Sequence, residues 1–314
     1  MLISLFVVLT LLLVMLILLL GAKHVRARIV RVCVRCVSAI VLLPLIISAG
    51  YLLACLCQTA PEELPSYPQD IELTVHQFEQ FASPAIAYIA KIKLDSVDLE
   101  LTPANGALTT SVALAKYDAD IAVNASFFGP FRDNHVFDYY PHSGDMVKPV
   151  GVAFSGNSCA GRPNPKWPYL YKTSSGDWRV GIGLGSCLEH INAGHKFALA
   201  GKSWFLKQGD VVVPPDEDYY PRTILAIDTR AEILWLVVVD GKQPGYSKGI
   251  PLYELAKFLK TLGGHNAIEL DGGGSSTMAL RLPNGDVDVI NRPAHTKIPR
   301  RERPVANHLL VKIN

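Results

Sequence analysis

The first 57 residues contain two long apolar runs. Residues 1–22 and 37–57 are almost entirely apolar, and each run is long enough to cross a bilayer as a helix. Five basic residues and no acidic one lie between them: Lys23, Arg26, Arg28, Arg31 and Arg35. Short cytoplasmic loops of membrane proteins are rich in Lys and Arg. The pattern predicts a transmembrane hairpin around a basic loop, with the chain after residue 57 on the extracytoplasmic side.

Two other interpretations of this N-terminal segment stay open. One is a single cleaved or anchoring segment, although no basic residue precedes the first apolar run, as a secretory signal would require. The other is a lipoprotein signal, because residues 52–55, Leu-Leu-Ala-Cys, loosely resemble a lipoprotein cleavage site. In each case the rest of the chain is expected to lie outside the cytoplasm.

The pattern of apolar positions changes after residue 57. Residues 58–70 contain three prolines and are interpreted as an extended linker. From residue 71 to 314, short apolar or alternating stretches predict strands, and two stretches have helical periodicity. The strands are expected at 86–101, 121–124, 147–154, 197–201, 203–213, 224–228, 233–240 and 266–270, and the helices at 109–116 and 252–262. Residues 132–145 are polar and aromatic, which is typical of a long functional loop.

Two of the predicted strands end in an Asp-Gly pair, at Asp240 and at Asp271. The helix expected at 252–262 separates them, so residues 233–270 form a predicted strand–helix–strand unit. If the two strands are parallel neighbours, both carboxylates lie at one edge of the sheet. Ligands of α/β sheets commonly bind beyond the carboxyl ends of the strands.

The second Asp-Gly pair opens the sequence Asp-Gly-Gly-Gly-Ser-Ser-Thr at 271–277. Consecutive glycines let the backbone bend sharply and approach a ligand closely, and several amides in one concavity bind an anion. A plain glycine-rich connector is the alternative. The residues expected to hold a phosphate are Gly272, Gly273, Gly274, Ser275 and Ser276. No Gly-Lys-Ser/Thr follows, so this is not a nucleotide phosphate loop.

Charge and cysteine usage limit the class of protein. All 28 Asp and Glu residues lie after residue 57, together with all but five of the 30 Lys and Arg residues. The globular part is therefore slightly acidic, and we expect no nucleic-acid partner. It contains two of the six cysteines, Cys159 and Cys187. In an exported domain they are candidates for one disulfide, and two separate buried thiols are the alternative.

Six motifs, in this order, resemble those of the phosphodiester glycosidase family: Asn124–Phe128, Tyr220–Thr223, Val237–Gly241, Leu252–Ala256, Leu270–Thr277 and Arg303–Asn307. The resemblance spans residues 92–313. It implies an α+β fold with a mixed central sheet and flanking helices. It also implies hydrolysis of the bond between the anomeric carbon of a sugar and a phosphodiester oxygen. Two positions depart from the family pattern: Ala125-Ser126 replaces two glycines, and Glu269 stands where a neutral residue is frequent.

A glycosidase normally uses two carboxylates. Asp271 and Asp240 are the catalytic candidates, and Glu269 is a substitute because residues two apart on a strand share a face. Arg222 is the candidate phosphate ligand, since its planar fork matches phosphate oxygens. The remaining candidate ligands are Asn124 and Asn307 for sugar hydroxyls, and Arg303, whose basic surroundings are otherwise typical of a solvated loop.

The sequence thus predicts a membrane-anchored hydrolase that acts outside the cytoplasm on an N-acetylhexosamine-like sugar-1-phosphodiester. The expected partners are the membrane and a glycan or sugar-phosphate polymer of the cell envelope or exopolysaccharide. Two alternatives are a non-catalytic module that binds an anionic glycopolymer and a transferase that uses the same site. No cofactor is expected and no histidine spacing predicts a metal site; a divalent cation held by Asp residues is the alternative.

Overall fold

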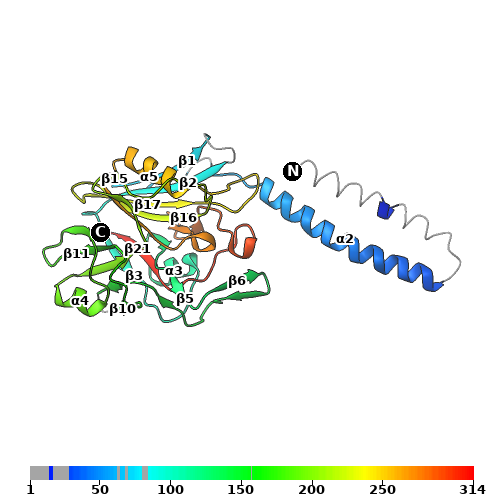
Figure 1. The fold of residues 1–314 in the computed structure, drawn as a ribbon, viewed down its shortest axis with the longest axis horizontal. Helices are drawn as coiled ribbons and strands as arrows, with labels where there is room; N and C mark the ends of the chain where they lie inside the picture. Colours follow the sequence, from blue (N-terminus) through cyan, green and yellow to red (C-terminus); the bar gives the residue numbers. More distant parts are fainter. Residues whose placement is uncertain (1–13, 17–27, 62–63, 68–69, 80–83, 157) are drawn as a thin grey trace. The chain divides into compact units, whose positions relative to one another are not determined.

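The computed structural model describes residues 14–16, 28–61, 64–67, 70–79, 84–156 and 158–314. The chain divides into two compact units, residues 1–57 and residues 58–314 (Figure 1). In the first unit, helix α2 (Arg28–Leu56) contains Pro44. Its segment Arg35–Leu56 is long and apolar enough to cross a membrane, and no other described helix is.

The predicted hairpin is described only in part. The first apolar run, residues 1–22, lies outside the described residues except for Val14–Leu16, which are helical. Three of the residues expected in the basic loop, Arg28, Arg31 and Arg35, belong instead to helix α2. No Gly or Pro precedes Pro44 in this helix, so nothing in the local sequence ends the helix before the apolar run begins.

Residues after position 57 are attached to the second unit. The Gln58 amide donates a hydrogen bond of 2.6 Å to Gln243 Oε1. The Tyr67 hydroxyl lies 2.6 Å from the carbonyl oxygen of Arg281, and Leu64 packs against the main hydrophobic core. The segment expected to be an extended linker is therefore fastened to the domain at several points, because its apolar side chains have a core surface to cover.

The second unit has the α+β fold that the sequence predicts. Its strands form three large sheets. The first has the order β1 (Ile71–Phe78), β2 (Ala85–Lys93), β17 (Ile233–Val239), β16 (Arg222–Ile227), β18 (Asn266–Glu269), β14 (Trp204–Lys207) and β15 (Asp210–Val211). The second has the order β20 (Val287–Val289), β19 (Met278–Arg281), β4 (Ile121–Asn124), β21 (His308–Ile313) and β3 (Val97–Leu101). The third has the order β10 (Ser158–Ala160), β9 (Ala153–Ser155), β13 (Phe197–Ala200), β11 (Tyr169–Lys172) and β12 (Trp178–Gly181).

The remaining elements are short. Two two-stranded ribbons pair β5 (Phe128–Gly129) with β8 (Lys148–Pro149) and β6 (Arg132–His135) with β7 (Asp138–Tyr140). The helices are α3 (Thr110–Lys116), α4 (Cys187–Asn192) and α5 (Leu252–Thr261), with the 3-10 turns η2 (Gly273–Ser275) and η3 (His295–Lys297). Cys159 on β10 and Cys187 on α4 form a disulfide with Cα atoms 5.9 Å apart. This is the pairing that the cysteine count left open.

Strand β17 lies in the centre of the core because it is apolar on both faces. Leu236 and Val238 pack toward one cluster, and Trp235 and Val237 pack toward the other. Helix α5 covers the second cluster with a stripe that includes Leu255, Ala256 and Leu259. Figure 1 shows α5 on the outer side of the seven-stranded sheet and β21 of the second sheet on its other side.

The order of strands around α5 differs from the expectation. Strands β17 and β18 are not neighbours, because β16 lies between them and is antiparallel to both. The short connection 228–232 closes β16 and β17 into a hairpin, which is a more local pairing than a crossover through α5. Both β17 and β18 still end at the same edge of the sheet. After β18 the chain crosses through the glycine turn to β19 in the second sheet.

Candidate active site

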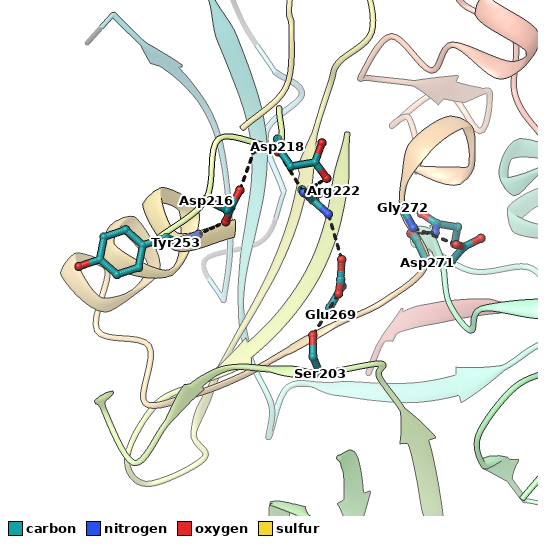
Figure 2. Close-up of polar contacts among 9 residues, drawn as sticks. Ser203, Asp216, Asp218, Arg222, Tyr253, Glu269, Asp271 and Gly272 are labelled. Carbon is teal, nitrogen blue, oxygen red and sulfur yellow. Dashed lines mark hydrogen bonds and ion pairs between the residues drawn. The ribbon is translucent and has the colours of Figure 1, made fainter. Parts of the chain in front are cut away.

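Asp271 lies at the crossover between the two sheets, where its backbone is held on both sides. Its N–H donates to the carbonyl oxygen of Ala125 over 3.0 Å, and its carbonyl oxygen accepts 2.6 Å from Asn124 Nδ2. Its carboxyl Oδ1 accepts 3.0 Å from the Gly272 N–H (Figure 2). Strands β4 and β18 thus position a half-buried carboxylate.

A pocket of about 610 Å³ opens at this carboxylate, a volume within the usual range for small-molecule sites. Its walls contain aromatic, basic and acidic side chains in similar numbers. They are Phe127, Phe128, Phe131, Asp133, Lys202, Asp218, Tyr220, Arg222, Lys242, Glu269, Asp271, Gly272 and Arg303. Of the predicted site residues, Asp271, Glu269, Arg222, Arg303 and Gly272 line this pocket, whereas Asp240, Asn124, Asn307, Gly273, Gly274, Ser275 and Ser276 do not.

Glu269 and Arg222 form a buried ion pair on one wall of the pocket. Glu269 Oε1 lies 3.2 Å from Arg222 Nη1, and its Oε2 accepts 3.0 Å from the Ser203 hydroxyl. Arg222 Nη2 donates 3.1 Å to the carbonyl oxygen of Asp218. Figure 2 shows this chain of contacts beside Asp271. The guanidinium fork expected to hold a phosphate is therefore already engaged by Glu269, which pairs with Ile224 of β16, two residues from Arg222.

Arg303 forms a second wall, and it is not the solvated loop residue that its basic surroundings indicate. Its side chain is 6% exposed and pairs with Asp133. It also donates 3.2 Å to the Ser275 hydroxyl and 3.2 Å to His295 Nδ1. The guanidinium carbon lies 4.6 Å from the centre of the Phe131 ring. The motif match, rather than the local charge pattern, indicated that this residue lies at the pocket.

The amides of the glycine turn do not form the predicted anion cradle. The Gly273 N–H donates 2.9 Å to Pro221 O. The Ser275 and Ser276 N–H groups donate to the carbonyl oxygens of Gly272 and Gly273, 3.3 and 3.2 Å away. These bonds close the turn on itself as a 3-10 helix. Backbone groups that satisfy one another are not available to a ligand.

The three glycines are required by close packing instead. A Cβ at Gly272 would lie 2.9 Å from Pro221 O, and one at Gly274 would lie 2.7 Å from Arg303 Nη2. Gly273 has a φ of +66°, a conformation that side-chain-bearing residues rarely adopt. The turn is thus pressed between the start of β16 and the guanidinium of Arg303. The glycines do allow a close approach of the backbone, as the sequence predicts, but the groups that approach it belong to the protein itself.

Asp240 is buried and lies outside the pocket lining, where its carboxylate accepts hydrogen bonds from two neighbouring loops. Its carboxylate accepts 2.9 Å from the Tyr246 hydroxyl, 2.8 Å from Asn291 Nδ2 and 2.9 Å from the Arg292 N–H. Its carbonyl oxygen accepts 2.6 Å from the Ser247 hydroxyl. Both carboxylate oxygens of Asp240 are bonded to the 241–249 and 291–292 loops. Asp240 therefore does not line the pocket with Asp271.

The two asparagines proposed for sugar binding are also buried and internally bonded. Asn124 Oδ1 accepts 2.9 Å from the Thr223 hydroxyl and 3.1 Å from the Thr277 N–H. Asn307 Oδ1 accepts 3.0 Å from the Ser126 N–H, and its amide donates 3.2 Å to the Ser126 hydroxyl. The side-chain oxygens of the two asparagines thus accept from main-chain N–H groups near the crossover. Ser126, where the family pattern has glycine, supplies part of this network.

Burial raises the pKa of the Asp271 carboxyl to about 6. Hydrogen bonds from Ser275 and Gly272 and the charge of Arg303 oppose this rise, and the neighbouring charge of Glu269 adds to it. The pocket thus contains one carboxyl whose pKa lies below neutral pH and a second that is paired with arginine. A glycosidase normally uses two carboxyl groups.

Sequence reasoning missed Asp133, Lys202 and Lys242 as well as the aromatic lining. Phe127, Phe128 and Tyr220 lie inside the motifs that resemble the family, which is a signal that could have identified them. Asp133 lies in the segment expected to be a long polar loop, where the structure has strand β6. The two lysines lie in connections without a recognisable pattern. In the part of the chain that the structure describes, no three His, Cys, Asp or Glu side chains gather as metal ligands would.

Comparisons with known proteins agree with this architecture. The catalytic domain of zebrafish N-acetylglucosamine-1-phosphodiester alpha-N-acetylglucosaminidase, auto-inhibited by its pro-peptide, is 20% identical with a TM-score of 0.59, covering 82% of this chain and 87% of that one. A hypothetical protein from Synechocystis is 15% identical with a TM-score of 0.53, covering 81% and 64%. A putative exported protein from Burkholderia pseudomallei K96243 is 15% identical with a TM-score of 0.52, covering 74% and 75%.

These likenesses concern the fold. No curated protein matches the sequence. Residues 117–312, more than half of the chain, match the phosphodiester glycosidase family. This range contains every residue that lines the pocket around Asp271. The chain therefore belongs to the phosphodiester glycosidase family.

Proposed function

We propose that the protein hydrolyses a sugar-1-phosphodiester, breaking the bond between the anomeric carbon and a phosphodiester oxygen, with an N-acetylhexosamine-like sugar as the glycosyl group. The observation that carries this proposal is the pair of unlike carboxyls in one pocket. Glu269 forms a buried ion pair with Arg222, whereas burial raises the pKa of Asp271 to about 6. Membership of the family supports the same reaction class.

Asp271 is the group that works on the anomeric carbon, directly or through a water molecule. With a pKa of about 6, it is mostly ionised at neutral pH. The leaving group is a phosphate ester whose second pKa is about 6, so its departure needs little protonation. The Glu269 carboxylate lies in the same pocket, where it can stabilise the positive charge that develops on the sugar in the transition state.

The aromatic residues supply a surface for the sugar ring. Phe127, Phe128, Phe131 and Tyr220 form part of the pocket wall, and apolar walls with a few placed polar groups are usual for ligand sites. Arg303 fixes one side of this surface through its contact with the Phe131 ring. Sugar hydroxyls can then bond to the pocket carboxylates.

We also infer that the enzyme is anchored in a membrane and acts on the extracytoplasmic side. The apolar segment Arg35–Leu56 supports the anchor. The Cys159–Cys187 disulfide supports an oxidising compartment. Its substrate would then belong to the cell envelope or to an exopolysaccharide.

The test uses the full-length protein in detergent with the methyl phosphodiester of N-acetylglucosamine-1-phosphate. We expect release of free sugar and methyl phosphate. Asp271→Asn should lower kcat by about a thousandfold or more, corresponding to about 4 kcal/mol in the barrier. Asp288→Asn, at an exposed position outside the pocket, is the matched control and should match the wild type.

The products decide between the reaction classes. Sugar found on an added glycan instead of in water would identify a transferase. Binding of the diester with no turnover under any condition would identify a binding module. Turnover that is unchanged in Asp271→Asn would remove Asp271 from the mechanism.

A further inference from the structure

The two arginines of the Asp271 pocket form ion pairs within the protein. Arg222 is engaged by Glu269 and, at 3.6 Å, by Asp218. Arg303 is engaged by Asp133. Both guanidinium groups therefore have carboxylate partners within the protein. An anionic substrate that used either of them would have to compete with an existing ion pair.

Two lysines in the same pocket have no such partner. Lys202 and Lys242 line the pocket, and neither ammonium group has a carboxylate within 4.0 Å in the described part of the chain. Each is placed against an aromatic ring instead. Lys242 Nζ lies 3.9 Å from the centre of the Tyr220 ring, and Lys202 Nζ lies 5.6 Å from that of Phe127. These two lysines are the cations that remain available to a phosphate.

Lys242 is held in place by its loop. Its φ is +60°, a conformation that is uncommon for residues with a side chain and costs about 1 kcal/mol or more. The loop is bonded to Asp240, whose carboxylate accepts from the Tyr246 hydroxyl and whose main-chain oxygen accepts from the Ser247 hydroxyl. A strained backbone that is fixed by a buried carboxylate indicates that the position of this lysine matters.

The same loop presents a second lysine. The N–H of Lys242 donates 3.2 Å to the carbonyl oxygen of Lys248, so the two residues are adjacent on the loop. Lys248 Nζ lies 4.2 Å from the centre of the Tyr219 ring, and it too has no carboxylate within 4.0 Å among the described residues.

A second hollow borders the same lysine, Lys242. It has a volume of about 400 Å³ and is lined by Pro84, Lys242, Gln243, Pro244, Gly245 and Lys248. Lys242 borders both hollows. The described residues that line the second hollow include a further lysine, Lys248, and no carboxylate.

We propose that Lys242 and Lys202 bind the phosphate of the scissile diester and that Lys248 binds the next phosphate along the chain. The substrate is then a polymer with consecutive phosphodiester linkages, which the enzyme shortens from its terminal sugar. This inference rests on the proposed hydrolysis. It assigns phosphate recognition to lysines of two loops rather than to Arg222 or the glycine turn.

The experiment compares two substrates with the same terminal sugar, one with a single methyl phosphodiester and one an oligomer with three phosphodiester linkages. Full-length protein in detergent should prefer the oligomer in kcat/KM, and 0.3 M salt should reduce this preference because it screens exposed charges. Lys248→Gln should lower the ratio of oligomer to single-diester kcat/KM about fivefold, as expected for one exposed charge contact. Lys242→Gln should raise KM for both substrates. Lys166→Gln, an exposed lysine outside both hollows, is the matched control.

The possible failures are distinguishable. If sugar is released but the oligomer has no advantage, or Lys248→Gln leaves the ratio unchanged, the inference is overturned and the proposed function stands. A binding measurement with the Asp271→Asn protein separates recognition from turnover, and Lys248→Gln should weaken oligomer binding there about fivefold. If Lys248→Gln weakens binding to vesicles of anionic lipid but not to the oligomer, the lysines serve the membrane and the inference is wrong.

Discussion

The side-chain amide of Asn124 donates a 2.6 Å hydrogen bond to the main-chain oxygen of Asp271. Asn124 ends a strand of the second sheet, and Asp271 follows a strand of the first. This bond therefore joins two sheets at the carboxylate that we propose to be catalytic. It also explains why an asparagine that belongs to a family motif has no contact with the pocket.

Asn124→Ala should destabilise the protein and lower its activity together. The substitution leaves the buried Thr277 N–H and the Asp271 carbonyl without partners, at about 1–3 kcal/mol for each buried group. Thermal or urea unfolding of the second unit, followed in the intact chain, measures the loss of unfolding free energy. Asn192→Ala, at an exposed position of α4, is the control. A variant with wild-type stability and only a higher KM would instead make Asn124 a sugar ligand.

Asp240→Asn should retain most of the activity, within about tenfold of the wild type, because it keeps the shape of a group that lies outside the pocket. Asp271→Asn should lose about a thousandfold or more. Steady-state kinetics of both proteins at the same pH makes the comparison. Equal losses in the two variants would return Asp240 to the catalytic pair.

The rate should depend on the ionised form of Asp271. Its pKa in the free enzyme is about 6, so kcat/KM should rise with pH through about 6 and level off above about 7. Measurement from pH 4.5 to 8 with a substrate whose diester stays ionised gives the profile. A rate that falls as pH rises through 6 would mean that Asp271 acts as an acid.

Asp240 should make stability fall between about pH 4 and pH 6. Burial raises its pKa to about 6 in the folded protein, above the value of about 4 in the unfolded chain. The native state therefore binds the proton more tightly over this range, and the free energy of unfolding decreases as the proton is lost. The difference in unfolding free energy between wild type and Asp240→Asn should decline by about 3 kcal/mol. A difference that grows with pH would contradict this assignment.

Gly274→Ala should lower activity while the protein still folds. The new Cβ would lie 2.7 Å from Arg303 Nη2, and the guanidinium would have to move away from Asp133 and Ser275. We expect a loss of about tenfold in kcat/KM, or about 1.4 kcal/mol. Circular dichroism checks the fold. Wild-type kinetics would show that the position of Arg303 has no effect on turnover.

Local patterns predicted much of the fold. The alternation and apolar runs identified β17 and α5, since a strand buried on both faces and a helix with one apolar stripe leave clear periodicities. The order of β16 between β17 and β18 was not predictable in this way, because two pairings satisfy the same apolar pattern. The prolines after residue 57 predict an extended segment. They do not indicate which core surface its apolar side chains cover, so the packing of this segment was not predictable.

The sequence alone determined that the Asp-Gly-Gly-Gly turn is a place of close approach, that Asp271 stands at the end of a buried strand, and that the family motifs surround it. Only the tertiary structure decided which groups lie against the turn and which charged groups remain unpaired in the pocket. Arg222 is paired with Glu269, two residues before Asp271. The N–H groups of Gly273, Ser275 and Ser276 donate to main-chain oxygens of the protein, and Lys242 comes from a loop that is bonded to Asp240. These contacts join residues far apart in the chain, and their partners are fixed by packing of the sheets rather than by any local spacing.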